Sequence, residues 1–94
     1  MPANFDIKQL GRIISFDNQP STARKLLVNV IDPSAIGSSG SNGIIYQQVA
    51  NDLRLLTTEI PSSEVGADKN FIVVVQMFDG NNQPVAFKQE TMKF

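Results

Sequence analysis

The stretch that decides the fold is FIVVVQMF at residues 71–78, which runs into DGNNQP at residues 79–84 and then VAFK at residues 85–88. The first segment is rich in β-branched and aromatic residues, and its one polar side chain is Gln76. This pattern predicts a β-strand, a turn and an antiparallel partner strand. Because both faces of the first strand are apolar, we expect it in the middle of a sheet. Another layer or a partner subunit would then cover its second face.

Two segments nearer the N-terminus also have the pattern of strands. Residues 5–16 are interpreted as one long strand interrupted at Gly11, because a glycine inside a strand commonly marks a bulge or a bend between sheets. Residues 24–31 alternate, so that the side chains at 26, 28 and 30 share one apolar face. Asp32 and Pro33 end this strand, since proline has no N–H to donate to a strand ladder.

The segment at residues 43–60 fits two kinds of secondary structure. Its apolar residues Ile45, Val49 and Leu53 fall at helical spacing, whereas its β-branched ends suit strands. We favour two strands joined by a turn at residues 50–52, because asparagine and aspartate are poor residues for a helix interior.

A glycine- and serine-rich stretch at residues 33–43 separates these strands and has the composition of a loop. Two interpretations stay open for this loop. It is either a long exposed connection or a loop that binds a partner and becomes ordered on contact.

Composition excludes several classes of protein. The chain has 94 residues, 41% hydrophobic and 18% charged, so we expect one globular domain spanning residues 1–94. It contains no cysteine and no histidine, which removes disulfides, histidine dyads and histidine- or thiolate-bound zinc. The formal charge of −1, without a basic block, argues against nucleic-acid binding. No apolar run is long enough to cross a membrane, and no signal peptide is recognisable at the start.

Acidic residues offer the remaining candidates for chemistry. A minor hypothesis is that three strand-end aspartates converge at one pole of the fold and bind calcium: Asp17, Asp32 and Asp79. Strand-end aspartates are more often simple turn residues. The spacing of the glutamates at 59, 64 and 90 does not predict the acid and base pair of a glycosidase. We therefore predict no catalytic residue, no metal, no cofactor and no enzymatic activity.

The order of residues 53–60, a loop, residues 71–78 and the turn into Val85 resembles the closing strands of an immunoglobulin-like or fibronectin type III-like β-sandwich. The chain differs from antibody domains, because it lacks the cysteine pair, the core tryptophan and a clear tyrosine corner. The resemblance implies binding, spacing or assembly rather than catalysis. The predicted fold is an all-β, antiparallel Ig-like β-sandwich of about six to seven strands.

The predicted function is that of a structural or interaction protein, most specifically a small virion component that decorates the capsid of a tailed phage or acts there as an accessory protein. It would then lie in the virion, or in the host cytoplasm during assembly. Its partner would be a protein, either a capsid lattice or further copies of itself. The expected contact residues lie in the termini and the serine-rich loop: Phe5, Ile36, Ser38, Ser39, Asn42 and Phe94. The alternative is an Ig-like binding or spacer module cut from a secreted adhesin or polysaccharide-degrading enzyme.

Overall fold

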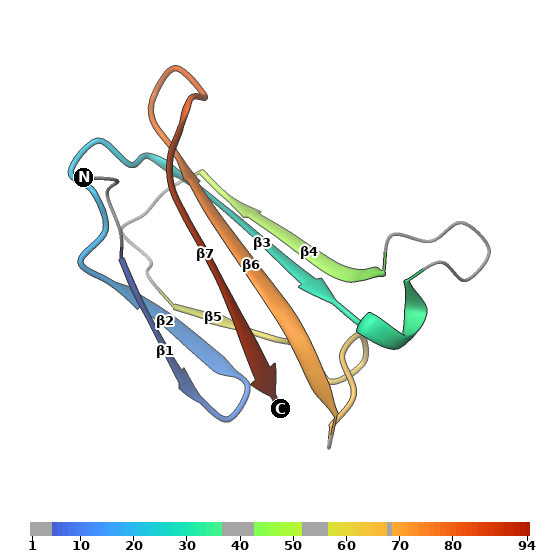
Figure 1. Ribbon diagram of the computed structural model, residues 1–94. Coiled ribbons are helices and arrows are strands. Elements are labelled where there is room, and N and C mark those ends of the chain that lie inside the picture. Colours follow the sequence, from blue (N-terminus) through green and yellow to red (C-terminus); the bar gives the residue numbers. More distant parts are fainter. Residues whose placement is uncertain (1–4, 37–42, 52–56, 68) are drawn as a thin grey trace.

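The computed structural model describes residues 5–36, 43–51, 57–67 and 69–94. These residues form an all-β sandwich of seven strands in two antiparallel sheets (Figure 1). The strands are β1 (Asp6–Leu10), β2 (Ile13–Asp17), β3 (Lys25–Ile31), β4 (Ile44–Ala50), β5 (Thr57–Glu59), β6 (Asn70–Phe78) and β7 (Pro84–Lys93). One short 3-10 helix, η1 (Pro33–Ala35), follows β3. The expected fold class and number of strands are thus confirmed.

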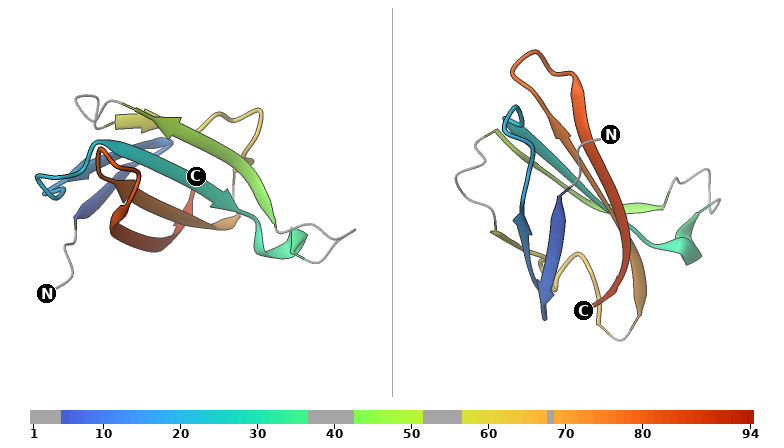
Figure 2. Two further views of the ribbon diagram at one scale, coloured as in Figure 1. Left: turned by 90° about the horizontal axis from the view of Figure 1, so that it is seen from above. Right: turned by 60° about the vertical axis from the view of Figure 1, so that its left-hand side comes forward.

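The two sheets lie one over the other as separate layers (Figure 2). One sheet has three strands in the order β1-β2-β5, and the other has four in the order β4-β3-β6-β7. The chain passes from one sheet to the other after β2, after β4 and after β5. Within the described ranges, no helix is long and apolar enough to span a lipid bilayer.

The predicted hairpin of β6 and β7 is confirmed, and β6 lies between β3 and β7 in the middle of its sheet. Asp79 organises the turn between the two strands, because its Oδ1 accepts hydrogen bonds from the backbone N–H groups of Asn81 (2.8 Å) and Gln83 (3.0 Å). Asn82 adopts a left-handed conformation with φ 61°. The turn residues therefore act as their types predict, and β7 runs to Lys93.

The prediction of one long strand over residues 5–16 is wrong. Gly11 has φ +61°, and the chain reverses there to form the β1–β2 hairpin, with Leu10 opposite Ile13. A positive φ at only the first of two central residues is the pattern of a type II′ turn, which favours glycine. Gly11 thus makes a turn within one sheet instead of a bend between two.

In the described part of residues 43–60 the chain forms two strands, as we predicted, and not the alternative helix. The first, β4, pairs with β3 in the four-stranded sheet, and the second, β5, pairs with β2 in the other sheet. The two strands therefore do not form a hairpin with each other. The expected turn ends at Asp52, which lies outside the described residues together with the beginning of the second predicted strand.

The core lies between the inner faces of the two sheets. Every second residue of β3 and of β6 is buried there, as their alternation predicts. The buried apolar side chains are Phe5, Ile14, Phe16, Ala23, Leu26, Val28, Val30, Ile60, Val65, Phe71, Val73, Val75, Met77, Ala86 and Met92. Burial of this common inner face is what holds the two sheets together.

Side-chain hydrogen bonds join the two sheets along one open side of the sandwich. Lys88 of β7 donates from Nζ to the carbonyl oxygen of Phe5 at 3.1 Å, and Gln9 of β1 donates from Nε2 to the carbonyl oxygen of Lys93 at 2.8 Å. Lys88 and Glu90 lie in register with buried valines of β6, on the inner side of an edge strand. Inward-pointing charges of this kind discourage a further strand from pairing with an exposed edge.

Candidate functional site: the outer face of the four-stranded sheet

The outer face of the four-stranded sheet is the surface of β4, β3, β6 and β7 that points away from the core. Strand registry places its residues in rows across the sheet, because side chains that are paired on neighbouring strands point to the same side. One row contains Val49, Leu27, Gln76 and Phe87, taken from one edge of the sheet to the other. Three of these four side chains are apolar, so the row forms an apolar stripe across the sheet.

Two members of this stripe are largely exposed. Phe87 is 56% exposed and Val49 is 49% exposed, while Leu27 between them is half-buried. Single apolar residues on a surface need no explanation, but a contiguous group on one face commonly marks a contact surface. The half-buried side chains of Ile72 and Val74 on β6 extend the same face.

Specific side-chain contacts fix the polar part of this face. The next row contains Gln47, Asn29, Val74 and Gln89. In it, Nε2 of Gln47 donates a hydrogen bond of 2.8 Å to Oδ1 of Asn29. This amide pair holds two polar side chains together between apolar neighbours, so the face is mixed rather than purely hydrophobic.

The charge of the outer face is entirely positive. Lys25 on β3 and Lys93 on β7 lie on it, and the Lys25 Nζ sits 6.0 Å from the centre of the Phe78 ring. Glu90 is the one carboxylate in these four strands, and it lies opposite buried Val73, on the inner side. The face therefore combines apolar area with lysines and carries no carboxylate.

The outer face of the three-stranded sheet has the opposite charge. Its strand residues include the carboxylates of Asp6, Asp17 and Glu59 and the single ammonium of Lys8. Lys8 forms an exposed ion pair of 3.2 Å with Asp17, and Nδ2 of Asn18 donates a 2.6 Å hydrogen bond to Asp6. Carboxylates outnumber lysines on this face, so its net charge is negative.

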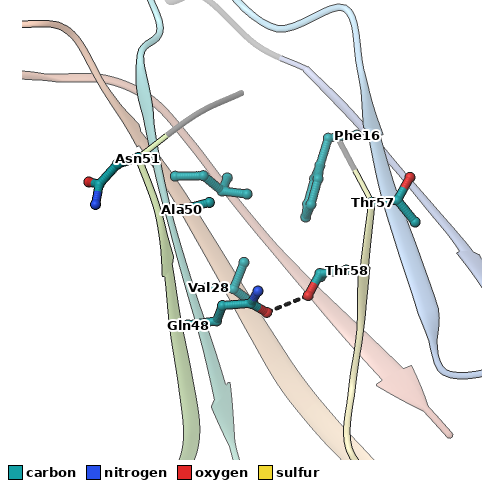
Figure 3. A pocket seen from close by; sticks show the side chains of 8 residues that line it. Phe16, Val28, Gln48, Ala50, Asn51, Thr57 and Thr58 are labelled. Atoms are coloured by element: carbon teal, nitrogen blue, oxygen red, sulfur yellow. Dashed lines mark hydrogen bonds between the residues drawn. The ribbon is translucent and has the colours of Figure 1, made fainter. Parts of the chain in front are cut away.

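A hollow of about 270 Å³ lies between the two sheets, on the side where β4 and β5 form the edges (Figure 3). Phe16 and Val28 line its apolar part. Gln48 of β4 and Thr58 of β5 point toward each other across it, and the Thr58 hydroxyl donates a hydrogen bond to Oε1 of Gln48. Oε1 of Gln48 also accepts a 3.1 Å hydrogen bond from the hydroxyl of Tyr46.

This arrangement in the hollow joins the two sheets rather than presenting reactive groups. Its remaining described lining residues are Leu26, Ala50, Asn51 and Thr57. None of the described lining residues has an acidic or basic side chain, so they supply neither a proton donor of ordinary acidity nor a charged anchor for a ligand.

The three aspartates of the calcium hypothesis do not converge, so that hypothesis is wrong. Asp17 pairs with Lys8, Asp79 closes its own turn, and Asp32 lies beside η1. Across the parts of the chain that the structure describes, no three acidic, histidine or cysteine side chains are grouped closely enough to hold a metal ion. Each aspartate serves the local structure around it.

Asp32 shows this local role most clearly. Its carboxylate accepts hydrogen bonds from Nζ of Lys69 at 2.6 Å and from the hydroxyl and backbone N–H of Ser34, at 2.7 and 3.0 Å. The Lys69 hydrogen bond, followed by those of Ser34, lowers the pKa of Asp32 below its ordinary value of 3.8. Asp32 thereby caps η1 and ties it to the segment that leads into β6.

The predicted contact residues do not form one surface in the structure. Phe5 is buried in the core, with its ring edge toward Phe16, and Phe94 is half-buried against Phe71. Ile36 is exposed beside η1. Ser38, Ser39 and Asn42 lie outside the described residues.

The outer-face residues of the four-stranded sheet were not predicted as a site from the sequence. The sequence did contain an indication of an apolar outer face, because a strand that is apolar on both faces implies that one apolar face points outward unless a second layer covers it. We noted this for β6, but the stripe also needs residues from β3, β4 and β7, whose alignment depends on strand registry.

The chain matches no family model, no curated protein and no solved structure. The fold and its surfaces are therefore the basis for a functional proposal.

Proposed function

We propose that this protein is a non-enzymatic assembly subunit that binds another protein through the outer face of its four-stranded sheet. The observation that carries the proposal is the row of Val49, Leu27 and Phe87, whose two end members are exposed, with Lys25 in the adjoining row, on a face without carboxylates. Aromatic and aliphatic side chains of this kind, with a polar rim, are typical of the centre of a protein interface.

The specific form of this proposal is a small virion component, such as a capsid-decorating or accessory protein of a tailed phage. A sandwich with an apolar contact face on one sheet is suited to a subunit that binds to a capsid lattice.

The strand order supports an Ig-like or fibronectin type III-like version of this fold. If the seven strands are named A, B, C, C′, E, F and G, their pairing gives an ABE sheet and a C′CFG sheet.

Charge indicates the chemistry of the partner. Lys25 lies in the row next to the apolar stripe, and Lys93 lies on the same face at the end of β7, so a complementary surface would present carboxylates around an apolar centre. This favours a protein surface as the partner.

The test is site-specific photo-crosslinking in the cells or particles in which the protein occurs naturally. A photoreactive phenylalanine analogue replaces Phe87, and a matched control carries it in place of Ser62, which is exposed in the loop after β5. We expect a defined protein adduct from position 87 and little from position 62. Equal labelling from both positions, or none from position 87, would overturn the proposal.

The same experiment tests the virion form. Adducts that sediment with virus particles support it, whereas a position-87 adduct found only on a secreted or cell-surface protein would contradict it and favour the alternative, a binding module of a larger extracellular protein.

A further inference from the structure

The two outer faces of the sandwich differ in charge in a way that makes them complementary. The four-stranded face presents Lys25 and Lys93 and no carboxylate. The three-stranded face presents three carboxylates, of Asp6, Asp17 and Glu59, and one lysine. The described strands thus place opposite charges on opposite sides of one small molecule.

Both faces also carry exposed apolar side chains of matching kind. On the three-stranded face, Leu10 is 80% exposed and its registry partner Ile13 is also exposed. On the four-stranded face, Val49 lies beside Leu27, and Phe87 lies at the other end of the same row, beyond Gln76. Two twisted sheets pack well face to face when apolar side chains interdigitate at about 10 Å, as they do in the core of a sandwich.

We propose that the partner of the four-stranded outer face is a second copy of this chain, which docks with its three-stranded outer face. This inference rests on the proposed function, because it uses the same face, and it names the occupant. In such a contact Leu10 and Ile13 of one copy lie against the stripe at Phe87 of the next. The two lysines then face the carboxylate-rich surface.

Charge disfavours the simplest alternative, a symmetric dimer of two four-stranded faces. That dimer would bring the lysines of both copies together without a carboxylate between them, which is unfavourable. A contact between two different faces leaves one face of each kind free at the ends. Such a contact therefore generates a closed ring or an open filament rather than a simple pair.

Two charge-reversal variants test this geometry. Lys25→Glu with Lys93→Glu makes the four-stranded face negative, and Asp6→Lys with Glu59→Lys makes the three-stranded face positive. All four side chains lie on strand surfaces outside the core, and thermal unfolding followed by circular dichroism verifies that both variants fold. Sedimentation velocity over a wide concentration range then measures self-association of the wild type, of each variant and of their equimolar mixture.

We expect the wild type to self-associate, and more weakly as salt is added, because screening weakens exposed charge pairs. Each variant alone carries two faces of like sign, so its association should be weaker by on the order of tenfold or more. The equimolar mixture should associate again, since each reversed face then meets a face of opposite sign.

Three results would overturn the inference. They are a wild type that stays monomeric at the highest concentration, variants that associate like the wild type, and a loss confined to the Lys25→Glu, Lys93→Glu variant. The last result would indicate that the three-stranded face is not used. In each case a crosslink from position 87 to another protein would leave the proposed function standing.

Discussion

Neighbouring valines on β6 should respond very differently to the same substitution. Val75 is fully buried opposite Val28, whereas Val74 is half-buried opposite Asn29 on the outer face. Val→Ala removes two methylene equivalents, worth about 1.6 kcal/mol at ~0.8 each when fully buried. A cavity in the packed core adds about 1 kcal/mol. Val75→Ala should therefore lower the free energy of unfolding by about 2 to 3 kcal/mol.

At Val74 only part of the side chain leaves water and no enclosed cavity forms, so Val74→Ala should cost about 1 kcal/mol or less. Loss of β-propensity is common to both variants and cancels in the comparison. Urea denaturation followed by far-ultraviolet circular dichroism measures the difference. With a slope of about 1 kcal/mol per molar for a small domain, the two midpoints should differ by at least about 1 M. Equal costs, or a larger cost at Val74, would refute the assigned inner and outer faces of β6.

Two further predictions concern the loops. Gly11→Ala should lower the free energy of unfolding by about 1 to 2 kcal/mol, because the site has φ +61° but open space around it. Gly43→Ala should lower it more, because the new Cβ would lie 2.6 Å from Cγ1 of Ile36. Denaturant unfolding that gave the two variants equal stability would contradict this. Asp32 should titrate below 3.8 by NMR, and Lys69→Met should move its pKa toward 3.8. Because folding lowers the pKa of Asp32, its contribution to stability should be complete above about pH 3.8 and should disappear as the pH falls through the folded-state pKa. An unchanged Asp32 pKa in the Lys69→Met variant would contradict the role of Lys69.

Much of the fold could be predicted from local residue patterns. The alternation in β3, the apolar run of β6 and the turn chemistry around Asp79 each follow from preferences of the chain within a few residues. Gly11 was misinterpreted because both a bend and a hairpin turn favour glycine, and only strand pairing distinguishes them. The separation of β4 and β5 into different sheets is likewise a matter of long-range pairing, which local patterns do not contain.

The candidate site was less predictable than the fold. Exposure at termini and loops led us to Phe5, whose side chain is in fact needed in the core against Phe16. The stripe at Val49, Leu27 and Phe87 brings together residues from three strands far apart in sequence. Its members are recognisable only after the registry of four strands is known, because a shift of one residue would turn each side chain to the opposite face.

The most direct test of the central claim is an NMR dilution series of the wild-type protein with methyl-resolved spectra. We predict that the methyl resonances of Leu27 and Val49 shift with concentration together with those of Leu10 and Ile13, while those of buried Val28 stay constant. That result would place both outer faces in contact between copies. Methyl resonances that are all independent of concentration, or shifts confined to Leu27 and Val49, would contradict the account.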